Sequence, residues 1–136
     1  MRAEDLMTRD VATLPHDASI GDAIELVGDQ GVRHVPLLEG GRVVGVVSDR
    51  DLRRVEGLVA RVLGRPDGAD AIMAAPVATL LSALPVTVPP SLTVDGIIDR
   101  LVSERVGAVV VVDEGDLLLG IVSYIDVLQA ARGKIG

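Results

Sequence analysis

Apolar and polar residues follow the same order twice along the chain. Two segments, residues 20–27 and 94–102, place apolar side chains at the three- and four-residue spacing of a helix. Ser19 and Thr93 stand directly before these segments, and a hydroxyl side chain at this position satisfies a free N–H group of the first helical turn. We therefore predict an α-helix at each place.

Behind each predicted helix come two short apolar segments, separated by a glycine-containing turn at residues 39–42 and again at 113–117. The segment from Val109 to Val112 is apolar without alternation, which indicates a strand covered on both faces. A second helix follows in each copy, with apolar positions at Leu52, Val55, Val59 and Val62 and then at Val127 and Leu128. Each copy thus predicts the order strand, helix, strand, strand, helix.

The two copies form an internal repeat. The last strand of each ends in the signature Gly-apolar-apolar-Ser-x-x-Asp, at Gly45–Asp51 and, 75 residues later, at Gly120–Asp126. Before the turn the offset is 74, so the additional residue lies in the turn, where hairpins tolerate changes in length. A repeat of this kind shows how many copies of one unit contribute to the fold.

The length of 136 residues suits one domain, or two small halves that share a core. We expect repeat 1 at residues 1–63, a linker at 64–76 and repeat 2 at 77–136. Neither half can bury its strands alone at this size, so we expect a mixed α/β (α+β) fold with the halves packed about a pseudo-twofold axis. The chain has no Phe, no Trp and one Tyr, so its core must be aliphatic.

Composition narrows the functional classes. The chain contains no cysteine, no uncharged apolar run long enough to span a membrane and no amino-terminal signal pattern, so we expect a cytoplasmic protein without a membrane partner. Its net charge of −7 argues against nucleic acid as a partner, since such proteins need a basic field around phosphate.

The chain resembles a tandem pair of cystathionine-β-synthase domains, or CBS domains, over essentially its whole length. The resemblance rests on the repeated element order, on both signatures, on segments 7–13 and 84–88 that lead into each repeat, and on Gly31–Leu37. It implies a regulatory module that binds an adenine nucleotide between the repeats: AMP, ADP or ATP, the last with Mg²⁺. In some members the ligand is S-adenosylmethionine, and no cofactor is required.

The residues of the two signatures suit such a ligand. An ionised carboxylate accepts hydrogen bonds from both hydroxyls of a ribose, and Asp51 and Asp126 are placed for this in the first turn of a helix. Ser48 and Ser123 can donate to a phosphate oxygen beside a helix N-terminus. The expected surroundings of the adenine are short apolar segments with free backbone groups, at Thr13, Leu14, Val35, Pro36, Thr87, Val88 and Val109.

The same signatures have a structural interpretation that needs no ligand. Ser-x-x-Asp at the start of a helix is a capping box, and a capping box can also bind a sugar. Gly45 and Gly120 can simply mark a bulge or a close approach of another strand.

Only repeat 1 carries cations near its signature. Arg33, His34 and Arg50 belong to repeat 1, whereas the matching positions in repeat 2 are uncharged, namely Gly107, Ala108 and Ile125. We therefore expect one tightly bound nucleotide per chain, with its phosphates near Arg33 and His34, and a second site that is weak or empty. The alternative is that Arg33 and His34 belong to a solvated surface patch that binds no phosphate. If His34 acts as a cation, affinity should rise as the pH falls near 6.5.

Catalysis is not expected, because the chain lacks cysteine, a glycine-rich phosphate loop and metal-ligand spacing. A nucleotide sensor, a dimerising scaffold with degenerate empty sites and, more remotely, a small nucleotide hydrolase remain as hypotheses. We expect a homodimer and an effector protein as partners. The helix after the first signature has more apolar surface than one core stripe needs, at Val55, Leu58, Val59 and Val62, while Arg53, Arg54 and Arg61 are expected on its outer face.

Overall fold

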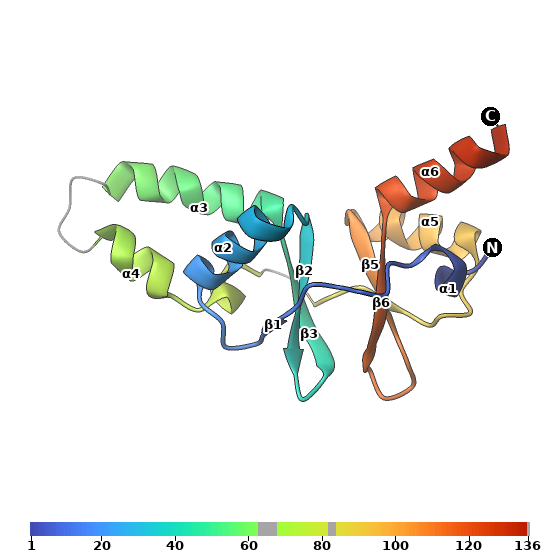
Figure 1. Ribbon diagram of the computed structural model, residues 1–136, viewed down its shortest axis with the longest axis horizontal. Helices are drawn as coiled ribbons and strands as arrows, with labels where there is room; N and C mark the ends of the chain where they lie inside the picture. The colour runs from blue at the N-terminus through green and yellow to red at the C-terminus, as the bar shows by residue number, and fades with distance from the viewer. Residues whose placement is uncertain (63–67, 82–83, 136) are drawn as a thin grey trace. The chain divides into compact units, whose positions relative to one another are not determined.

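The structure is a computed structural model that describes residues 1–62, 68–81 and 84–135 (Figure 1). Repeat 1 contains β1 (Leu14–Pro15), α2 (Ile20–Gln30), β2 (His34–Glu39), β3 (Arg42–Ser48) and α3 (Asp49–Val62). Repeat 2 contains β4 (Thr87–Val88), α5 (Val94–Glu104), β5 (Ala108–Val112), β6 (Leu118–Ser123) and α6 (Tyr124–Ile135). The order strand, helix, strand, strand, helix is therefore confirmed in both copies.

Three further elements lie outside this order: α1 (Ala3–Leu6), α4 (Gly68–Ala74) and the 3₁₀ helix η1 (Val77–Leu80). Helix α4 falls within the segment expected to be a linker and packs against α2 and α3. Residues 64–67 of that segment lie outside the described residues. Over the described ranges, no helix has both the length and the apolar character needed to cross a bilayer.

The predicted helix starts are confirmed by their hydrogen bonds. Ser19 forms a complete capping box, because its Oγ accepts from Asp22 N at 3.1 Å while its own N–H donates to Asp22 Oδ2 at 3.0 Å. Thr93 Oγ1 accepts from Gly96 N at 3.2 Å. Helix α2 ends at Gly31, whose φ of 64° is the left-handed conformation that glycine adopts without strain.

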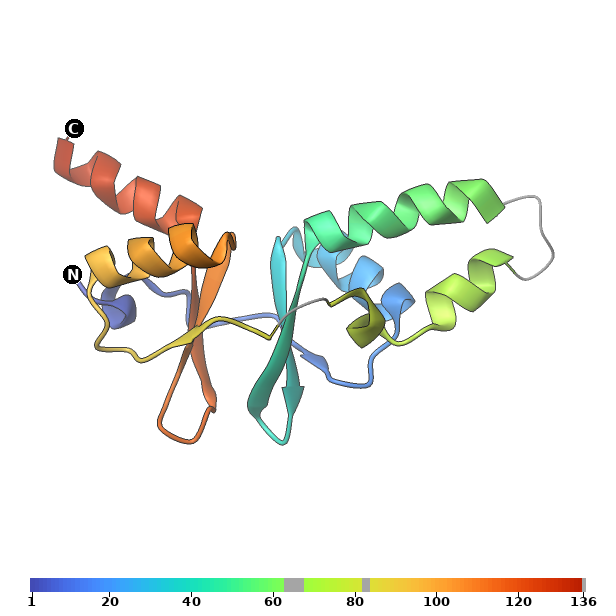
Figure 2. The ribbon, with the colours of Figure 1, turned by 180° about the vertical axis from the view of Figure 1, so that it is seen from behind.

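Each repeat builds its own three-stranded sheet, in the orders β1-β2-β3 and β4-β5-β6. The first strand of each sheet runs parallel to the second, with Leu14 opposite Leu37 and Thr87 opposite Val110. Strands β5 and β6 are antiparallel, and Ala108 lies opposite Ser123. In Figures 1 and 2, α2 and α3 lie on the same side of β2 and β3, and α5 and α6 lie on the same side of β5 and β6.

The chain divides into two compact units. The repeat-1 unit consists of Ala12–Glu39 and Val44–Leu84, and the repeat-2 unit consists of Met1–Val11, Gly40–Val43 and Pro85–Gly136. Both cores are aliphatic, as the composition predicted. The repeat-1 core contains Ala18, Ile20, Ala23, Val35, Leu37, Val47, Leu52, Val55 and Val77. The repeat-2 core contains Ala3, Val88, Ile97, Leu101, Val109, Val111 and Val122.

The two repeats exchange the segments that lead into them, residues 1–11 and 76–81, which we call the leading segments. Val77 precedes repeat 2 in the sequence, yet it is buried in the repeat-1 core, where its N–H donates to Ala18 O at 2.9 Å. Ala3 precedes repeat 1 and is buried in the repeat-2 core, where its N–H donates to Leu92 O at 2.8 Å. Each unit thus contains the leading segment of the other repeat.

The signature glycines lie where the leading segments cross the last strands. A Cβ atom at Gly120 would lie 2.7 Å from both Met7 Sδ and Thr8 O, and a Cβ at Gly45 would lie 2.5 Å from Leu81 Cδ1. Both distances are shorter than a carbon atom tolerates. Met7 and Leu81 occupy matching positions of the repeat. The interpretation as a point of close strand approach is therefore confirmed at Gly120, where a backbone oxygen is the neighbour, whereas the neighbour at Gly45 is a side chain.

Candidate functional site

The signature of repeat 1 forms a corner where β3 ends and α3 begins. Ser48 N donates to Asp51 Oδ2 at 3.0 Å, and Asp51 N donates to Ser48 Oγ at 3.2 Å. These reciprocal bonds are those of a capping box, so the structural interpretation of the motif is confirmed. The Asp51 side chain is 21% exposed, so the carboxylate is partly accessible as well.

The signature of repeat 2 forms an equivalent corner between β6 and α6. Ser123 N donates to Asp126 Oδ2 at 2.8 Å, Ser123 Oγ donates to the same oxygen at 3.1 Å, and Asp126 N donates to Ser123 Oγ at 3.2 Å. The two copies of the signature therefore form the same capping hydrogen bonds. Each corner offers one carboxylate at a helix N-terminus, where the helix dipole favours an anion.

The corners differ in the second oxygen of the carboxylate. In repeat 1, Arg54 Nη2 donates to Asp51 Oδ1 at 2.6 Å, although the Arg54 side chain is 64% exposed. In repeat 2 the matching position is Gln129. Among the described residues, none donates a hydrogen bond to Asp126 Oδ1. Sequence reasoning placed Arg54 on the outer helix face and missed this pair, although its spacing of three residues from Asp51 is a usual signal of one.

The start of β2 brings the basic residues of repeat 1 to the same corner. Arg33 O accepts from Asp49 N at 2.8 Å, which ties the chain before β2 to the start of α3. His34 lies close enough to be influenced by the charges of Asp49, Arg33 and Asp51. Arg50 is exposed in the first turn of α3. The structure therefore gathers Arg33, His34 and Arg50 around the first signature.

His34 is not the cation that the sequence suggested at neutral pH. Burial lowers the pKa of its imidazole below 6.5, Arg33 lowers it further, and Asp49 and Asp51 only partly oppose this. The expected titration near 6.5 is corrected to a more acidic range. A neutral imidazole can still donate one hydrogen bond and accept another.

In repeat 2 the described residues at the positions that match these cations are uncharged. Tyr124 N donates to Gly107 O at 3.0 Å, which is the counterpart of the bond between Asp49 and Arg33. Ala108 follows at the start of β5, and the partly buried Ile125 stands where repeat 1 has Arg50. The two corners thus share their backbone geometry and differ in charge.

The residues expected around an adenine differ in how far their side chains are buried. Val35 and Val109 are 0% exposed and Val88 is 1% exposed, and all three belong to the cores, so only their backbone groups remain for a ligand. Pro36 is also buried. The partly exposed residues of this set are those on and beside the short first strands, Thr13, Leu14 and Thr87.

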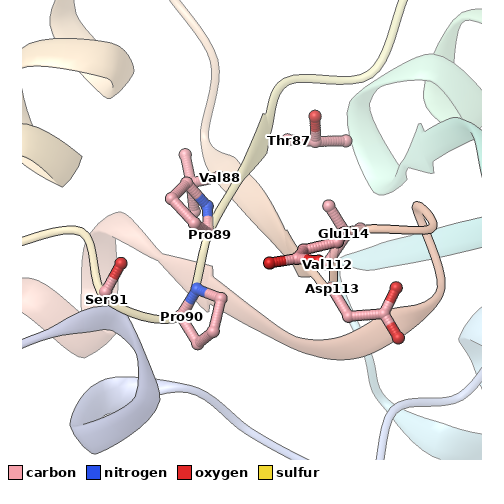
Figure 3. A pocket seen from close by; sticks show the side chains of 8 residues that line it. All are labelled: Thr87, Val88, Pro89, Pro90, Ser91, Val112, Asp113 and Glu114. Carbon is pink, nitrogen blue, oxygen red and sulfur yellow. The ribbon is translucent and has the colours of Figure 1, made fainter.

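A hollow of about 450 Å³ lies in the repeat-2 unit, at the opposite end of its sheet from the signature (Figure 3). It lies beyond Val112, which pairs with Leu118, whereas Ser123 pairs with Ala108 at the other end of β5. Its lining comes from the ends of β4 and β5 and the residues that follow them, namely Thr87, Val88, Pro89, Pro90, Ser91, Val112, Asp113 and Glu114. Thr87 and Val88 therefore lie among the residues that line this hollow.

Within the part of the chain that the structure describes, no group of three or more His, Asp or Glu side chains is arranged to hold a metal ion. Both corners instead combine a carboxylate and a hydroxyl at a helix N-terminus. This combination suits a ligand with a sugar diol and an anionic group.

Comparison with curated proteins identifies relatives that are longer than this chain. The 5′-AMP-activated protein kinase subunit gamma-3 of Sus scrofa is 35% identical over 123 residues, which are 90% of this chain and 23% of that protein. An uncharacterized protein of Methanocaldococcus jannaschii is 28% identical over 136 residues, which are 98% of this chain and 45% of that protein. The chain thus spans less than half the length of these relatives.

Solved structures match the chain over nearly its full length. CBSX2, whose crystal structure is a complex with AMP, is 25% identical with a TM-score of 0.78, and the match covers 99% of this chain and 98% of CBSX2. A CBS-domain containing protein from Agrobacterium tumefaciens is 27% identical with a TM-score of 0.75, over 96% of this chain and 99% of that one. The family model described as CBS domain matches residues 3–57 and again 70–133. With both repeats matched, the chain belongs to the CBS domain family as a tandem pair.

Proposed function

We propose that this CBS pair is a regulatory module that binds an adenine nucleotide and passes the signal to a partner protein. The observation that carries the proposal is the Ser-x-x-Asp corner, which recurs in the same hydrogen-bonded form in both repeats. CBSX2, similar over nearly the whole chain, binds AMP. The relative in Sus scrofa is named as a subunit of an AMP-activated kinase.

In this proposal each group of the corner has a chemical role. The carboxylates of Asp51 and Asp126 accept hydrogen bonds from ribose hydroxyls. Arg33 and Arg50 attract the phosphates, since a guanidinium pairs with phosphate through two parallel hydrogen bonds. Neutral His34 contributes a hydrogen bond rather than a charge. AMP needs no metal ion, whereas ATP would bring Mg²⁺ with its phosphates.

We propose regulation rather than catalysis, because both signature serines are engaged in their own caps. Ser48 Oγ and Ser123 Oγ each accept from the aspartate N–H three residues on, and Ser123 Oγ also donates to that aspartate. The carboxylate oxygen that holds the Ser123 hydroxyl also accepts from Ser123 N, so we assign it to the cap rather than to activation of a nucleophile. Prolonged incubation with AMP, ADP and ATP, analysed for released phosphate or adenine, should yield no product.

A panel of ligands in a thermal-shift experiment tests the proposal. AMP, ADP, ATP, GTP and S-adenosylmethionine are each added to the full chain at millimolar concentration. A ligand at 100 times its dissociation constant adds about 2.7 kcal/mol to the stability. We expect stabilisation by adenine nucleotides and little by GTP. If none of the five ligands stabilises the protein, the scaffold hypothesis replaces the sensor.

We also propose that the module pairs with a second copy of itself, through a surface other than the one first expected. Val55 is 1% exposed in the repeat-1 core, and Val59 packs against that core. Leu58, at 47% exposed, remains accessible to a second copy. The side chain of Val62 lies outside the described set. The repeat-2 unit exposes apolar side chains on α5 and α6, at Ile98, Val102 and Leu128. These side chains lie on two helices that contact each other, which supports an interface there.

A further inference from the structure

The two corners differ in how many oxygens of their carboxylates accept hydrogen bonds. Both oxygens of Asp51 are engaged, Oδ2 by Ser48 N and Oδ1 by Arg54 Nη2. In the corner of repeat 2, both donors from Ser123 reach the same oxygen of Asp126, Oδ2. Over the described residues, Oδ1 of Asp126 accepts no hydrogen bond.

The difference follows from a single position of the repeat. Arg54 lies three residues after Asp51, on the same face of α3, so its guanidinium reaches back to the carboxylate at 2.6 Å. At the matching position of α6 stands Gln129, which is uncharged. The neighbouring Arg53 forms a comparable pair with Asp49 at 3.4 Å, but Asp49 is not part of the signature.

A vicinal diol and a guanidinium compete for the same atoms. Both are hydrogen-bond donors, and both favour an ionised carboxylate as the acceptor. At the repeat-1 corner a ribose hydroxyl competes with Arg54 for the lone pairs of Asp51 Oδ1, which makes this oxygen a weaker acceptor for the sugar. At the repeat-2 corner it meets an open oxygen on Asp126.

We propose that Arg54 is the specificity-determining residue that closes the repeat-1 carboxylate to a sugar diol, which makes Asp126 the main ribose acceptor of the chain. This inference rests on the proposed function and assigns its two corners unequal roles. Arg54 acts through Asp51, so it is a positioning residue.

The size of the effect follows from the exposure of the pair. Arg54 is 64% exposed, and exposed ion pairs change an equilibrium by up to about fivefold, which is about 1 kcal/mol. Replacing Arg54 should therefore strengthen diol recognition at the first corner by up to about fivefold. Placing an arginine at position 129 should weaken it at the second corner by a similar factor.

The experiment measures the preference for AMP over 2′-deoxy-AMP by calorimetry, since the two ligands differ by one ribose hydroxyl. The full chain is compared with Asp126→Ala, with Asp126→Ala combined with Arg54→Gln, and with Gln129→Arg. Arg53→Gln in the same Asp126→Ala background is the matched control, because it removes the same charge one residue away. Circular dichroism verifies that each variant is folded.

We expect Asp126→Ala to lose most of the preference and Arg54→Gln to restore it, while Arg53→Gln leaves it low. Gln129→Arg should reduce the preference with Asp126 still present, which keeps the test valid if Asp126→Ala fails to fold. Arg54→Gln weakening both ligands equally would mean that Arg54 contacts phosphate, and the inference would be wrong. An unchanged preference in every variant that binds AMP would overturn it while leaving nucleotide binding intact. If neither the unmodified chain nor any variant binds AMP, the proposed function itself fails, and this inference with it.

Discussion

Replacing Gly120 with alanine should destabilise the protein much more than the same change at Gly45, because the obstacles differ. A Cβ at Gly120 would lie 2.7 Å from Thr8 O, which is a backbone atom. That oxygen also accepts from Ile121 N at 3.0 Å, and Thr8 N donates to Ile121 O at 2.9 Å. The leading segment must therefore move as a whole and strain both hydrogen bonds.

The obstacle at Gly45 is softer. A Cβ there would lie 2.5 Å from Leu81 Cδ1, the far end of a flexible side chain that can change its rotamer. Overpacking a tight site costs about 1–3 kcal/mol, and each hydrogen bond lost adds about 1 kcal/mol. We expect about 1 kcal/mol for Gly45→Ala and about 3 kcal/mol for Gly120→Ala. At roughly 4 °C per kcal/mol, the second variant should melt roughly 12 °C below the unmodified chain.

The assay is thermal and urea unfolding followed by far-ultraviolet circular dichroism, since the chain has no tryptophan. Truncating the side chain above each glycine provides the control. Leu81→Ala should partly relieve Gly45→Ala, whereas Met7→Ala should relieve Gly120→Ala little, because Thr8 O stays in place. Equal losses for the two glycine variants would refute the idea that the backbone obstacle at Gly120 costs more than the side-chain obstacle at Gly45.

Three further predictions follow from the corners and the surface. Asp51→Ala and Asp126→Ala should each lower the stability by about 1 kcal/mol through the lost cap, as measured by urea unfolding; a loss above about 3 kcal/mol would point to a larger structural role. Because burial lowers the pKa of folded His34, the unfolded chain binds the proton more readily, so stability should be full above pH 6.5 and fall as the pH drops below it. This fall should be smaller in His34→Gln, and identical pH profiles for the two proteins would contradict the burial of the imidazole. Light scattering should report a dimer that Val102→Glu and Leu128→Glu weaken, and a monomer at micromolar concentration would exclude the proposed pairing.

Local sequence patterns were enough for the element order of both repeats. The hydroxyl residues at 19 and 93, the glycine-containing turns and the unbroken apolar run from Val109 to Val112 all correspond to the predicted structures. These features depend on neighbours a few residues away, which a single sequence displays directly. The capping geometry of Ser-x-x-Asp is of the same kind, and it too was predictable.

Other features depend on contacts that a pattern does not display. The leading segments make only isolated bridges, such as that of Thr8 with Ile121, and a single bridge leaves no pattern in the sequence, so their exchange could not be predicted. The position of Val55 along its helix is compatible with either the core or an apolar surface, and only the packing of the fold places it in the core. The lowered pKa of His34 comes from burial, which depends on the whole fold. The ion pair of Arg54 with Asp51 is different, because its three-residue spacing can be read from the sequence.

The exchange of leading segments has a consequence for how such a chain can be divided or assembled. One repeat produced alone would lack the segment that covers its signature glycine, unless a second copy supplied it. Two separate copies could complete each other in this way, but only at a protein concentration that favours association. Joining them in one chain makes the same exchange intramolecular, with an effective concentration in the millimolar range. Tandem fusion thus frees the folding of each half from dependence on protein concentration, and cutting the chain between the repeats should restore that dependence.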